Sequence, residues 1–290
     1  MSIWKEYHQP SSIKEAVNLL VSLPAPTNII AGGTDLMLDL NQGNHPPVFA
    51  LVDITEIEEM KQITSTANEI VIGACVTHNQ IVQNAMIQEN ASSLIEACGL
   101  IGGPQVRNSA TIGGNVGHAL PAADGTIGLL SLDTEIEIAS PDGMRRIPLT
   151  QFFVGPGKSI LADKPEFVTR FFIPKKGTQQ GSAFKRVMRA QGIALPILNN
   201  SVWIERDGEK IRNVRISIGP AGPTPFRAAK TEALLKGMSF GIEAIAQAQR
   251  SILDEAKFRT SPRRATAEYR RQLITELFSN TINQAWKRTF

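Results

Sequence analysis

The sequence predicts an α+β protein built from two or three compact units. Its 290 residues exceed one small domain but fall short of a large multidomain enzyme. Before residue 100, short apolar runs bounded by Gly, Pro or Asn alternate with stretches of helical periodicity, which indicates α/β units. Beyond residue 134, apolar and polar residues alternate in runs separated by turn signals, which indicates antiparallel sheet.

The first expected elements are a helix and two strands. Ser12 is followed three residues later by Glu15, a capping box, and apolar residues then recur at helical spacing, so we expect a helix over 12–22. The runs NIIA (28–31) and FALVDI (49–54) are short and apolar, as in buried strands. This order predicts an α/β unit near the N-terminus.

A second α/β layer follows. The run EIVIGA (69–74) predicts a strand, Thr77 caps the helix after it, and a further helix over 91–98 ends at Gly99. In EIEIASPDGMRRIPL (135–149), Pro-Asp-Gly separates two alternating runs, which predicts a hairpin. Antiparallel sheet therefore begins here.

The C-terminal part combines strands with helices. Three further alternating runs predict strands at 167–173, 182–189 and 197–205. RDGEK (206–210) predicts a hairpin, two helices are expected within 225–256, and a last helix is expected to open with Ser261 as N-cap and Pro262 in its first position. One apolar face of that last helix is interpreted as core packing, with Tyr269, Leu273, Leu277, Phe278, Ile282 and Trp286.

The main domain boundary is expected in PKKGTQQGS (174–182), because this stretch is the richest in Gly, Lys and Gln. The predicted domains are 1–176, with subdomains of about 1–57 and 58–176, and 177–290.

Composition excludes several classes of protein. Apolar residues make up 42% and charged residues 20%, with no low-complexity tract, which is typical of a globular chain rather than a disordered one. The segment MSIWKEYHQP has no apolar signal core, and no apolar run is long enough to cross a bilayer, so we expect a cytoplasmic protein without a membrane span.

Charge is distributed unevenly. Residues 201–290 hold 16 Lys and Arg against 9 Asp and Glu, a net charge of +7, whereas residues 1–200 carry −4. Two interpretations stay open, a docking surface or ordinary solvated helix faces. Because the basic residues are scattered and not interleaved with aromatic residues, nucleic-acid binding is not expected.

Two cysteines, Cys75 and Cys98, form no CxxC pair and have no histidine at ligand spacing. The sequence therefore predicts neither a disulfide framework nor a metal or iron–sulfur site, and both thiols are expected to be buried.

Two Gly-Gly pairs are the main candidates for a binding site. Gly32 and Gly33 directly follow a strand-like run, where glycine allows positive φ, close approach of a ligand to the backbone, and N–H groups that converge on an anion. The pattern is not GxGxxG, so a nicotinamide-type Rossmann site is not supported. ATIGGN (110–115) repeats the arrangement. One pair alone is usually a tight turn, but two pairs beside Thr and Asp or Asn favour a diphosphate site.

Other candidates carry less weight. GPGKS (155–159) has Phe153 where a phosphate-binding P-loop needs Gly, so we interpret it as a turn between strands. His8, His45, His78 and His118 have no partners at the spacing of a hydrolytic triad or a zinc site.

Two interpretations stay open for each of two residues that lie between the second Gly-Gly pair and the predicted hairpin. His118 either lies near a bound ligand or is a partly exposed loop residue. Asp124 either accepts hydrogen bonds from ribose or ribityl hydroxyls or caps a helix.

Taken together, several motifs resemble a known family, the flavin-binding middle subunit of molybdenum hydroxylases, which includes xanthine dehydrogenase and aerobic carbon monoxide dehydrogenase. The resemblance covers nearly the whole chain and is highly specific in its order and spacing. It rests on AGGTDL (31–36), GGPQVRNSATIGGN (102–115), PAAD (121–124), GPGKSIL (155–161), GPAGPTPFRA (219–228) and SPRRATAEYRRQL (261–273).

The resemblance implies an α+β fold. It would consist of a two-subdomain FAD-binding region, similar to that of the vanillyl-alcohol oxidases, and a small C-terminal domain of the carbon monoxide dehydrogenase flavoprotein type. That C-terminal domain would hold a three-stranded antiparallel sheet and helices.

The resemblance also implies the cofactor contacts. The diphosphate of FAD would lie on the backbone of 30–35 and of 111–115, and Asp124 would contact the sugar-like part. Val168, just before a strand, and Lys185 would lie against the flavin ring, where a cation stabilises the reduced ring. The chain would supply no catalytic side chain and no metal ligand. The implied FAD set is Ile29, Ile30, Ala31, Gly32, Gly33, Thr34, Asp35, Leu36, Ile101, Thr111, Ile112, Gly113, Gly114, Asn115, Asp124, Val168 and Lys185.

The implied function is electron transfer in a cytoplasmic complex. A molybdenum-cofactor subunit would oxidise the substrate, an iron–sulfur subunit with two-iron two-sulfur clusters would carry the electrons, and FAD would pass them to NAD or another acceptor. The expected assembly is a dimer of heterotrimers. A stand-alone flavoprotein oxidoreductase and a non-catalytic nucleotide-binding assembly subunit are the alternatives.

One segment departs from the family pattern. Members commonly carry Arg-x-x-x-Asp-Ile after the lysine, whereas this chain has RAQGIALPIL (189–198), which lacks the aspartate. Because the segment lies near the flavin in the family, the resemblance leaves the electron acceptor open.

Overall fold

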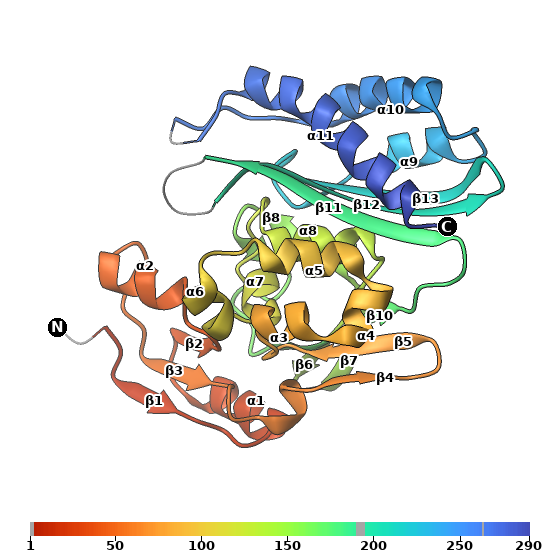
Figure 1. The fold of residues 1–290 in the computed structure, drawn as a ribbon. Helices are drawn as coiled ribbons and strands as arrows, with labels where there is room; N and C mark the ends of the chain where they lie inside the picture. Colours follow the sequence, from red (N-terminus) through yellow and green to blue (C-terminus); the bar gives the residue numbers. More distant parts are fainter. Residues whose placement is uncertain (1–2, 190–194, 263) are drawn as a thin grey trace.

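The computed structural model of the chain describes residues 3–189, 195–262 and 264–290 (Figure 1). Two layers of sheet enclose a layer of helices, and a further group of helices covers the outer face of the C-terminal sheet (Figure 1). The fold is α+β, as predicted.

The N-terminal unit is a small parallel sheet in the order β1-β3-β2. Its first helix begins where predicted, because the Ser12 hydroxyl accepts a hydrogen bond from the Glu15 amide at 3.2 Å. The capping box is only half formed, since the Glu15 carboxylate accepts from Ser11 rather than from Ser12. The elements are β1 (Glu6–His8), α1 (Ile13–Ser22), β2 (Thr27–Ile30), α2 (Leu36–Gln42) and β3 (Ala50–Asp53).

The second unit is a five-stranded sheet in the order β4-β5-β10-β6-β7, with helices on the face that looks toward the C-terminal domain (Figure 1). The Thr77 cap and the hairpin at Pro-Asp-Gly are both confirmed. The strands are β4 (Ile63–Ser65), β5 (Glu69–Gly73), β6 (Glu135–Ser140), β7 (Gly143–Pro148) and β10 (Phe167–Pro174), and β8 (Phe153–Gly155) pairs with β9 (Lys158–Ser159). The helices are α3 (His78–Gln83), α4 (Ala85–Asn90), α5 (Ser92–Gly99), α6 (Pro104–Ser109), α7 (Ile112–Gly117) and α8 (Asp124–Ser131), with short 3₁₀ turns at Glu58–Met60 and Leu149–Gln151.

The C-terminal domain is an antiparallel sheet in the order β11-β12-β13-β14, with three helices on its outer face (Figure 1). The strands predicted at 182–189 and 197–205 and the hairpin at 206–210 are confirmed, and a two-residue strand is added to the three-stranded sheet that the resemblance implies. The elements are β11 (Gln180–Met188), β12 (Pro196–Asp207), β13 (Lys210–Gly219), β14 (Phe226–Arg227), α9 (Ala229–Leu235), α10 (Ile242–Glu255) and α11 (Ala267–Lys287).

The start of the last helix differs from the prediction. Thr266 is the N-cap of α11, and its hydroxyl accepts from the Tyr269 amide at 3.1 Å. Ser261 instead pairs with Ala265 across a turn, so the Ser-Pro signal marks that turn and not the helix. The predicted apolar face packs into the C-terminal core, except Tyr269, which is 44% exposed in the first helical turn.

Helix α8 lies between the two domains. All of its eight residues are buried, because α5 and α7 pack on one side and β12 and β13 on the other. Gly128 fits against α5, where an added Cβ would lie 3.2 Å from the Ala97 Cβ. None of the helices in the described part of the chain combines the length and apolarity needed to span a bilayer; the cytoplasmic location stays a prediction.

Candidate functional site

The first Gly-Gly loop follows β2 and presents unpaired backbone donors. The amides of Gly32, Gly33, Thr34 and Asp35 donate to no acceptor within the described residues. Gly33 has φ +66°, in the left-handed region, and Asp35 has a right-handed helical backbone. Successive amides with mixed right-handed and left-handed conformations form a concave donor set that binds anions. This loop is therefore a candidate site for a phosphate group.

The second Gly-Gly loop uses its backbone differently from the prediction. Each amide from 112 to 115 already donates within the protein, to Val76 O, Ala74 O, Thr111 Oγ1 and Thr111 O, at 2.9–3.0 Å. An anion at this loop would instead meet side-chain donors, namely the Thr111 hydroxyl hydrogen and the Asn115 amide nitrogen, because Asn115 Oδ1 accepts from Thr126. The amides of 112–115 are thus occupied within the protein, whereas the Thr111 amide donates to no acceptor within the described residues, and the contact of this loop with a diphosphate stays a prediction.

The two loops lie against each other. A Cβ atom on Gly32 would be 2.0 Å from the Ser109 carbonyl oxygen, two residues before Thr111. Gly113 makes a separate close contact, with the segment after β5, because its Cβ atom would be 2.6 Å from the Ala74 carbonyl oxygen. Because any side chain would push these backbones apart, the glycines make the contact possible. The sequence prediction that both pairs serve one site agrees with this geometry.

An ion pair joins the two loops. His118 Nδ1 at the end of α7 lies 3.2 Å from Asp35 Oδ2 in the first loop. The hydrogen bond to Asp35 raises the pKa of His118, and the same bond lowers the pKa of Asp35. His118 is thus a partly exposed residue in the turn after α7, as one of the two interpretations predicted, and its position beside the first loop leaves contact with a ligand as a prediction.

His78 is a buried histidine beside this pair. Its side chain is 1% exposed, and Nδ1 has no hydrogen-bond partner among the described residues. Burial lowers its pKa to about 4, and the nearby Arg107 adds to this effect. The imidazole is therefore neutral at physiological pH.

Asp124 opens α8 and is enclosed by protein partners. Its Oδ2 forms an ion pair with the Arg186 guanidinium, and its Oδ1 accepts from Asn199 Nδ2 at 2.7 Å. Burial raises the pKa of Asp124 to about 6, while Arg186 and Asn199 act in the opposite direction. The helix-capping reading is wrong, because Ala123 is the N-cap and no side chain caps α8. Contact with a sugar stays a prediction.

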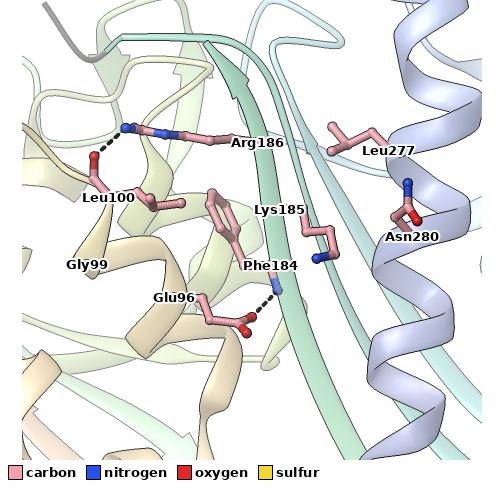
Figure 2. Close-up of a pocket in the computed structure, with 8 residues that line it drawn as sticks. All are labelled: Glu96, Gly99, Leu100, Phe184, Lys185, Arg186, Leu277 and Asn280. Atoms are coloured by element: carbon pink, nitrogen blue, oxygen red, sulfur yellow. Dashed lines mark hydrogen bonds between the residues drawn. The ribbon is translucent and has the colours of Figure 1, made fainter. Parts of the chain in front are cut away.

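Lys185 and Arg186 point to opposite faces of β11. Phe184 packs into the core of the N-terminal region, whereas Ala183 belongs to the C-terminal core, so the strand alternates between the two sides. Lys185 lines a cavity of about 520 Å³ between α5, β11 and α11 (Figure 2). Arg186 reaches the Leu100 carbonyl from the opposite side (Figure 2). The structure therefore does not bring Lys185 to the Gly-Gly loops.

Ile101 and Val168 are held by neighbouring protein groups. The Ile101 carbonyl accepts from Arg107 Nη1 at 3.1 Å. Val168 is the second residue of β10 and is 6% exposed within the core. The prediction that Val168 comes just before a strand is wrong, because β10 pairs with β6 from Phe167 onward.

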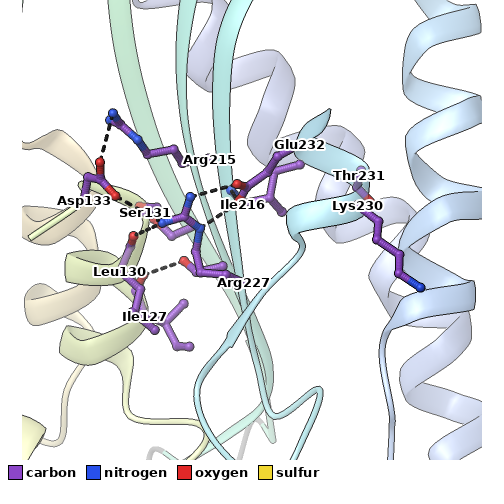
Figure 3. A network of polar contacts seen from close by, with 12 residues as sticks. Ile127, Leu130, Ser131, Asp133, Arg215, Ile216, Arg227, Lys230, Thr231 and Glu232 are labelled. Atoms are coloured by element: carbon purple, nitrogen blue, oxygen red, sulfur yellow. Dashed lines mark hydrogen bonds and ion pairs between the residues drawn. The ribbon is translucent and has the colours of Figure 1, made fainter. Parts of the chain in front are cut away.

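A polar network that the sequence did not predict connects α8 and the turn after it to β12, β13 and β14. Asp133 pairs with Arg215 and Arg227, and Arg227 also pairs with Glu232 at 2.7 Å (Figure 3). The Ser131 and Ser201 hydroxyls lie 2.6 Å apart, and the Ser217 hydroxyl donates to the Ile127 carbonyl. These contacts fix the two domains against each other. The sequence feature that could have indicated this network is the run of small and polar residues in α8.

The remaining predictions concern single features. Cys75 and Cys98 are buried as expected, and burial raises the pKa of both thiols. GPGKS forms the predicted turn, between β8 and β9. The described residues include no cluster of His, Cys, Asp and Glu that could hold a metal ion. In RAQGIALPIL, positions 190–194 lie outside the described residues.

The fold and the two Gly-Gly loops define a dinucleotide-binding flavoprotein. Residues 3–176 match the family model of the FAD binding domain in molybdopterin dehydrogenase, and residues 182–285 match that of the CO dehydrogenase flavoprotein C-terminal domain. The chain belongs to the family of FAD-binding subunits of molybdopterin-dependent dehydrogenases. The predicted family, cofactor and enzyme class are confirmed.

Individual relatives agree over almost their whole length. The xanthine dehydrogenase FAD-binding subunit of Escherichia coli O157:H7 is 31% identical over 281 residues, which cover 96% of this chain and 95% of the relative. The carbon monoxide dehydrogenase medium chain of Hydrogenophaga pseudoflava is 29% identical, covering 98% and 97%. The solved structure of carbon monoxide dehydrogenase from Hydrogenophaga pseudoflava superposes with a TM-score of 0.93 over 98% of this chain and 97% of that one, at 29% identity.

Proposed function

We propose that this chain carries FAD in a molybdenum hydroxylase complex and passes electrons from two-iron two-sulfur clusters of a partner subunit to NAD or another acceptor. The observation that carries the proposal is the run of unpaired amides at Gly32–Asp35. Four free backbone donors in one loop fit a diphosphate, which is the anionic part of FAD. The Thr111 hydroxyl and the Asn115 amide would complete the donor set from the second loop.

The chain's own residues bind and orient the cofactor. When bound, FAD accepts and releases electrons at its flavin ring. Gly32 and Gly33 leave room for the diphosphate to approach the backbone, and Asp124 would help to position the sugar-like part. The other proposed contacts come from the family resemblance and are Ile29, Ile30, Ala31, Leu36, Ile101, Ile112, Gly113, Gly114, Val168 and Lys185.

The proposed partners follow from the relatives. One related solved structure is that of a Cu,Mo-CO dehydrogenase. Other relatives are an FAD-binding subunit and a medium chain of larger dehydrogenases. We propose an iron–sulfur subunit and a molybdenum-cofactor subunit as partners, in a dimer of heterotrimers. We also propose that the chain divides into domains 1–176 and 177–290, since β10 ends at Pro174 and β11 begins at Gln180.

Gentle purification tests the proposed function. The chain is expected to show a flavin absorption spectrum, or to gain one when FAD is added, and to co-purify with a cysteine-rich chain and a molybdenum-containing chain. The proposal is lost if no flavin binds. Turnover of an organic substrate by the isolated chain would support a stand-alone flavoprotein, and bound flavin that a reduced iron–sulfur partner cannot reduce would support an assembly subunit.

Replacing Lys185 tests the flavin end of the site. Lys185→Ala is expected to retain FAD and to lower its reduction potential by about 20–90 mV, because a nearby unit charge contributes about 1–4 kcal/mol and about 30 mV corresponds to 1.4 kcal/mol for two electrons. Spectroelectrochemical titration measures the shift, with Lys230→Ala on α9 as the matched control. An unchanged potential would remove Lys185 from the ring environment.

A further inference from the structure

The pair formed by His118 and Asp35 is the one described ion pair that joins the two Gly-Gly loops. Asp35 contributes one of the four unpaired amides, so its carboxylate belongs to the same short loop as the diphosphate donors. The His118 side chain is 33% exposed and the Asp35 side chain 63% exposed, which leaves both accessible to a ligand. A group bound by this loop would therefore meet the pair directly.

The charge of this pair affects how strongly an anionic ligand can bind to the loop. A diphosphate carries two negative charges, and an uncompensated Asp35 carboxylate beside it would repel it. Protonated His118 neutralises Asp35 and can also donate from its second ring nitrogen, since His118 makes no other ion pair or side-chain hydrogen bond among the described residues. A neutral His118 would not offset the charge of Asp35, and it would be a weaker donor to the ligand.

We propose, on the basis of the proposed function, that His118 is a positioning residue for the FAD diphosphate, and that its protonation closes the two Gly-Gly loops on the cofactor and makes FAD affinity depend on pH. Asp35 positions the imidazolium by the ion pair between them. The imidazolium in turn offsets the negative charges of the Asp35 carboxylate and of the diphosphate.

The surrounding charges identify His118 as the titrating group. Asp39 on α2 also raises the pKa of His118. The hydrogen bond to His118 lowers the pKa of Asp35, so this carboxylate is ionised across the neutral range. His78 on α3, with a pKa of about 4, is neutral in this window, and the neighbouring Arg107 on α6 helps to keep it so. Of these groups only His118 changes charge near neutral pH.

The sign of the effect follows from the direction of the shift. The pKa of His118 is raised above its ordinary value of 6.5. The attraction is therefore fully present below pH 6.5 and is lost as the pH rises through the raised value. A bound diphosphate would raise that value further, because binding and protonation favour each other by the same factor.

The test is a pH profile of FAD affinity, measured by quenching of flavin fluorescence on the full apo chain between about pH 5.5 and 8.5. For the unaltered chain, the dissociation constant is expected to rise by about tenfold or more across the range. His118→Gln should bind about tenfold more weakly at the low end and show a flat profile. Asp35→Asn should move the transition to lower pH, because His118 loses the partner that raises its pKa.

His8 supplies the matched control. It forms a similar pair with Glu6 at 2.9 Å, with its side chain 30% exposed, but on β1, which β3 separates from β2. His8→Gln should keep the pH profile of the unaltered chain. A flat profile for the unaltered chain, or a His118→Gln profile that matches it, would overturn this inference and leave FAD binding intact. Failure to bind FAD at any pH would instead overturn the proposed function itself.

Discussion

Replacing Gly33 by valine is expected to remove FAD from the protein while leaving its fold in place. Gly33 has φ +66°, a conformation that a β-branched residue adopts only with strain. Its Cβ atom would lie 3.2 Å from Ile30 Cδ1 and 3.3 Å from Met37 Cγ, so the loop must shift. A shift of the loop moves the amides of Gly32–Asp35 and puts a side chain where the diphosphate approaches. We expect the affinity for FAD to fall at least about 100-fold.

Gly43 is a matched control for the backbone strain. It has φ +73° at the end of α2, and nothing lies within 4 Å of an added Cβ atom. Gly43→Val should therefore carry a similar conformational cost while keeping its flavin. Flavin content per chain and the far-ultraviolet circular dichroism spectrum measure the two effects. Equal flavin content in Gly33→Val and the unaltered chain would refute the assignment of the diphosphate to this loop.

Replacing Asp124 by alanine is expected to destabilise the protein by about 3–5 kcal/mol, because it leaves a buried guanidinium without its carboxylate. The Asp124 and Arg186 side chains are 4% and 3% exposed. Asp124 also accepts from Asn199 Nδ2, which would keep only the Ala122 carbonyl as acceptor in the variant. Urea denaturation of the purified chain near pH 7.5, monitored by tryptophan fluorescence, measures the change in the free energy of unfolding.

Two further variants separate the buried pair from ordinary surface charge. Glu58→Ala removes an exposed partner of Lys61, at 2.8 Å, and is expected to cost at most about 1 kcal/mol. The double variant Asp124→Ala with Arg186→Met should be more stable than Asp124→Ala alone, because no buried charge is left over. If the double variant is instead the less stable, the cost lies in packing and not in the unpaired charge.

Much of the fold could be predicted because its signals are local. Thr77 and Gln80 form a complete capping box, and Pro-Asp-Gly lies at the β6–β7 turn, so neighbouring residues alone determine these features. The predicted start of α11 was wrong, because Ser261 and Thr266 are both good N-cap residues. Only the pairing of Ser261 with Ala265 decides between them. That choice depends on three-dimensional contacts.

In the candidate site too, local features could be predicted from the sequence, and features that depend on distant residues could not. The position of Gly32 and Gly33 at the end of β2 followed from the sequence, since an apolar run leads directly into the glycines. The occupied amides of Ile112 and Gly113 did not, because their acceptors, Val76 and Ala74, are distant in sequence, whereas the next two amides donate to the nearby Thr111. Arg186 was also missed, although the alternation of β11 would have placed it on the same face as Phe184.

Helix α8 has a consequence for how this protein can evolve and be engineered. Because all eight of its residues are buried, with the FAD-binding region on one side and the C-terminal sheet on the other, neither half can be exchanged for a homologous one without matching both surfaces. Ser131, Asp133 and Asp124 each have partners across the boundary. The two halves are thus inherited as a matched pair, and a chimaera is expected to fold only if it carries α8 together with the β12 and β13 that enclose it.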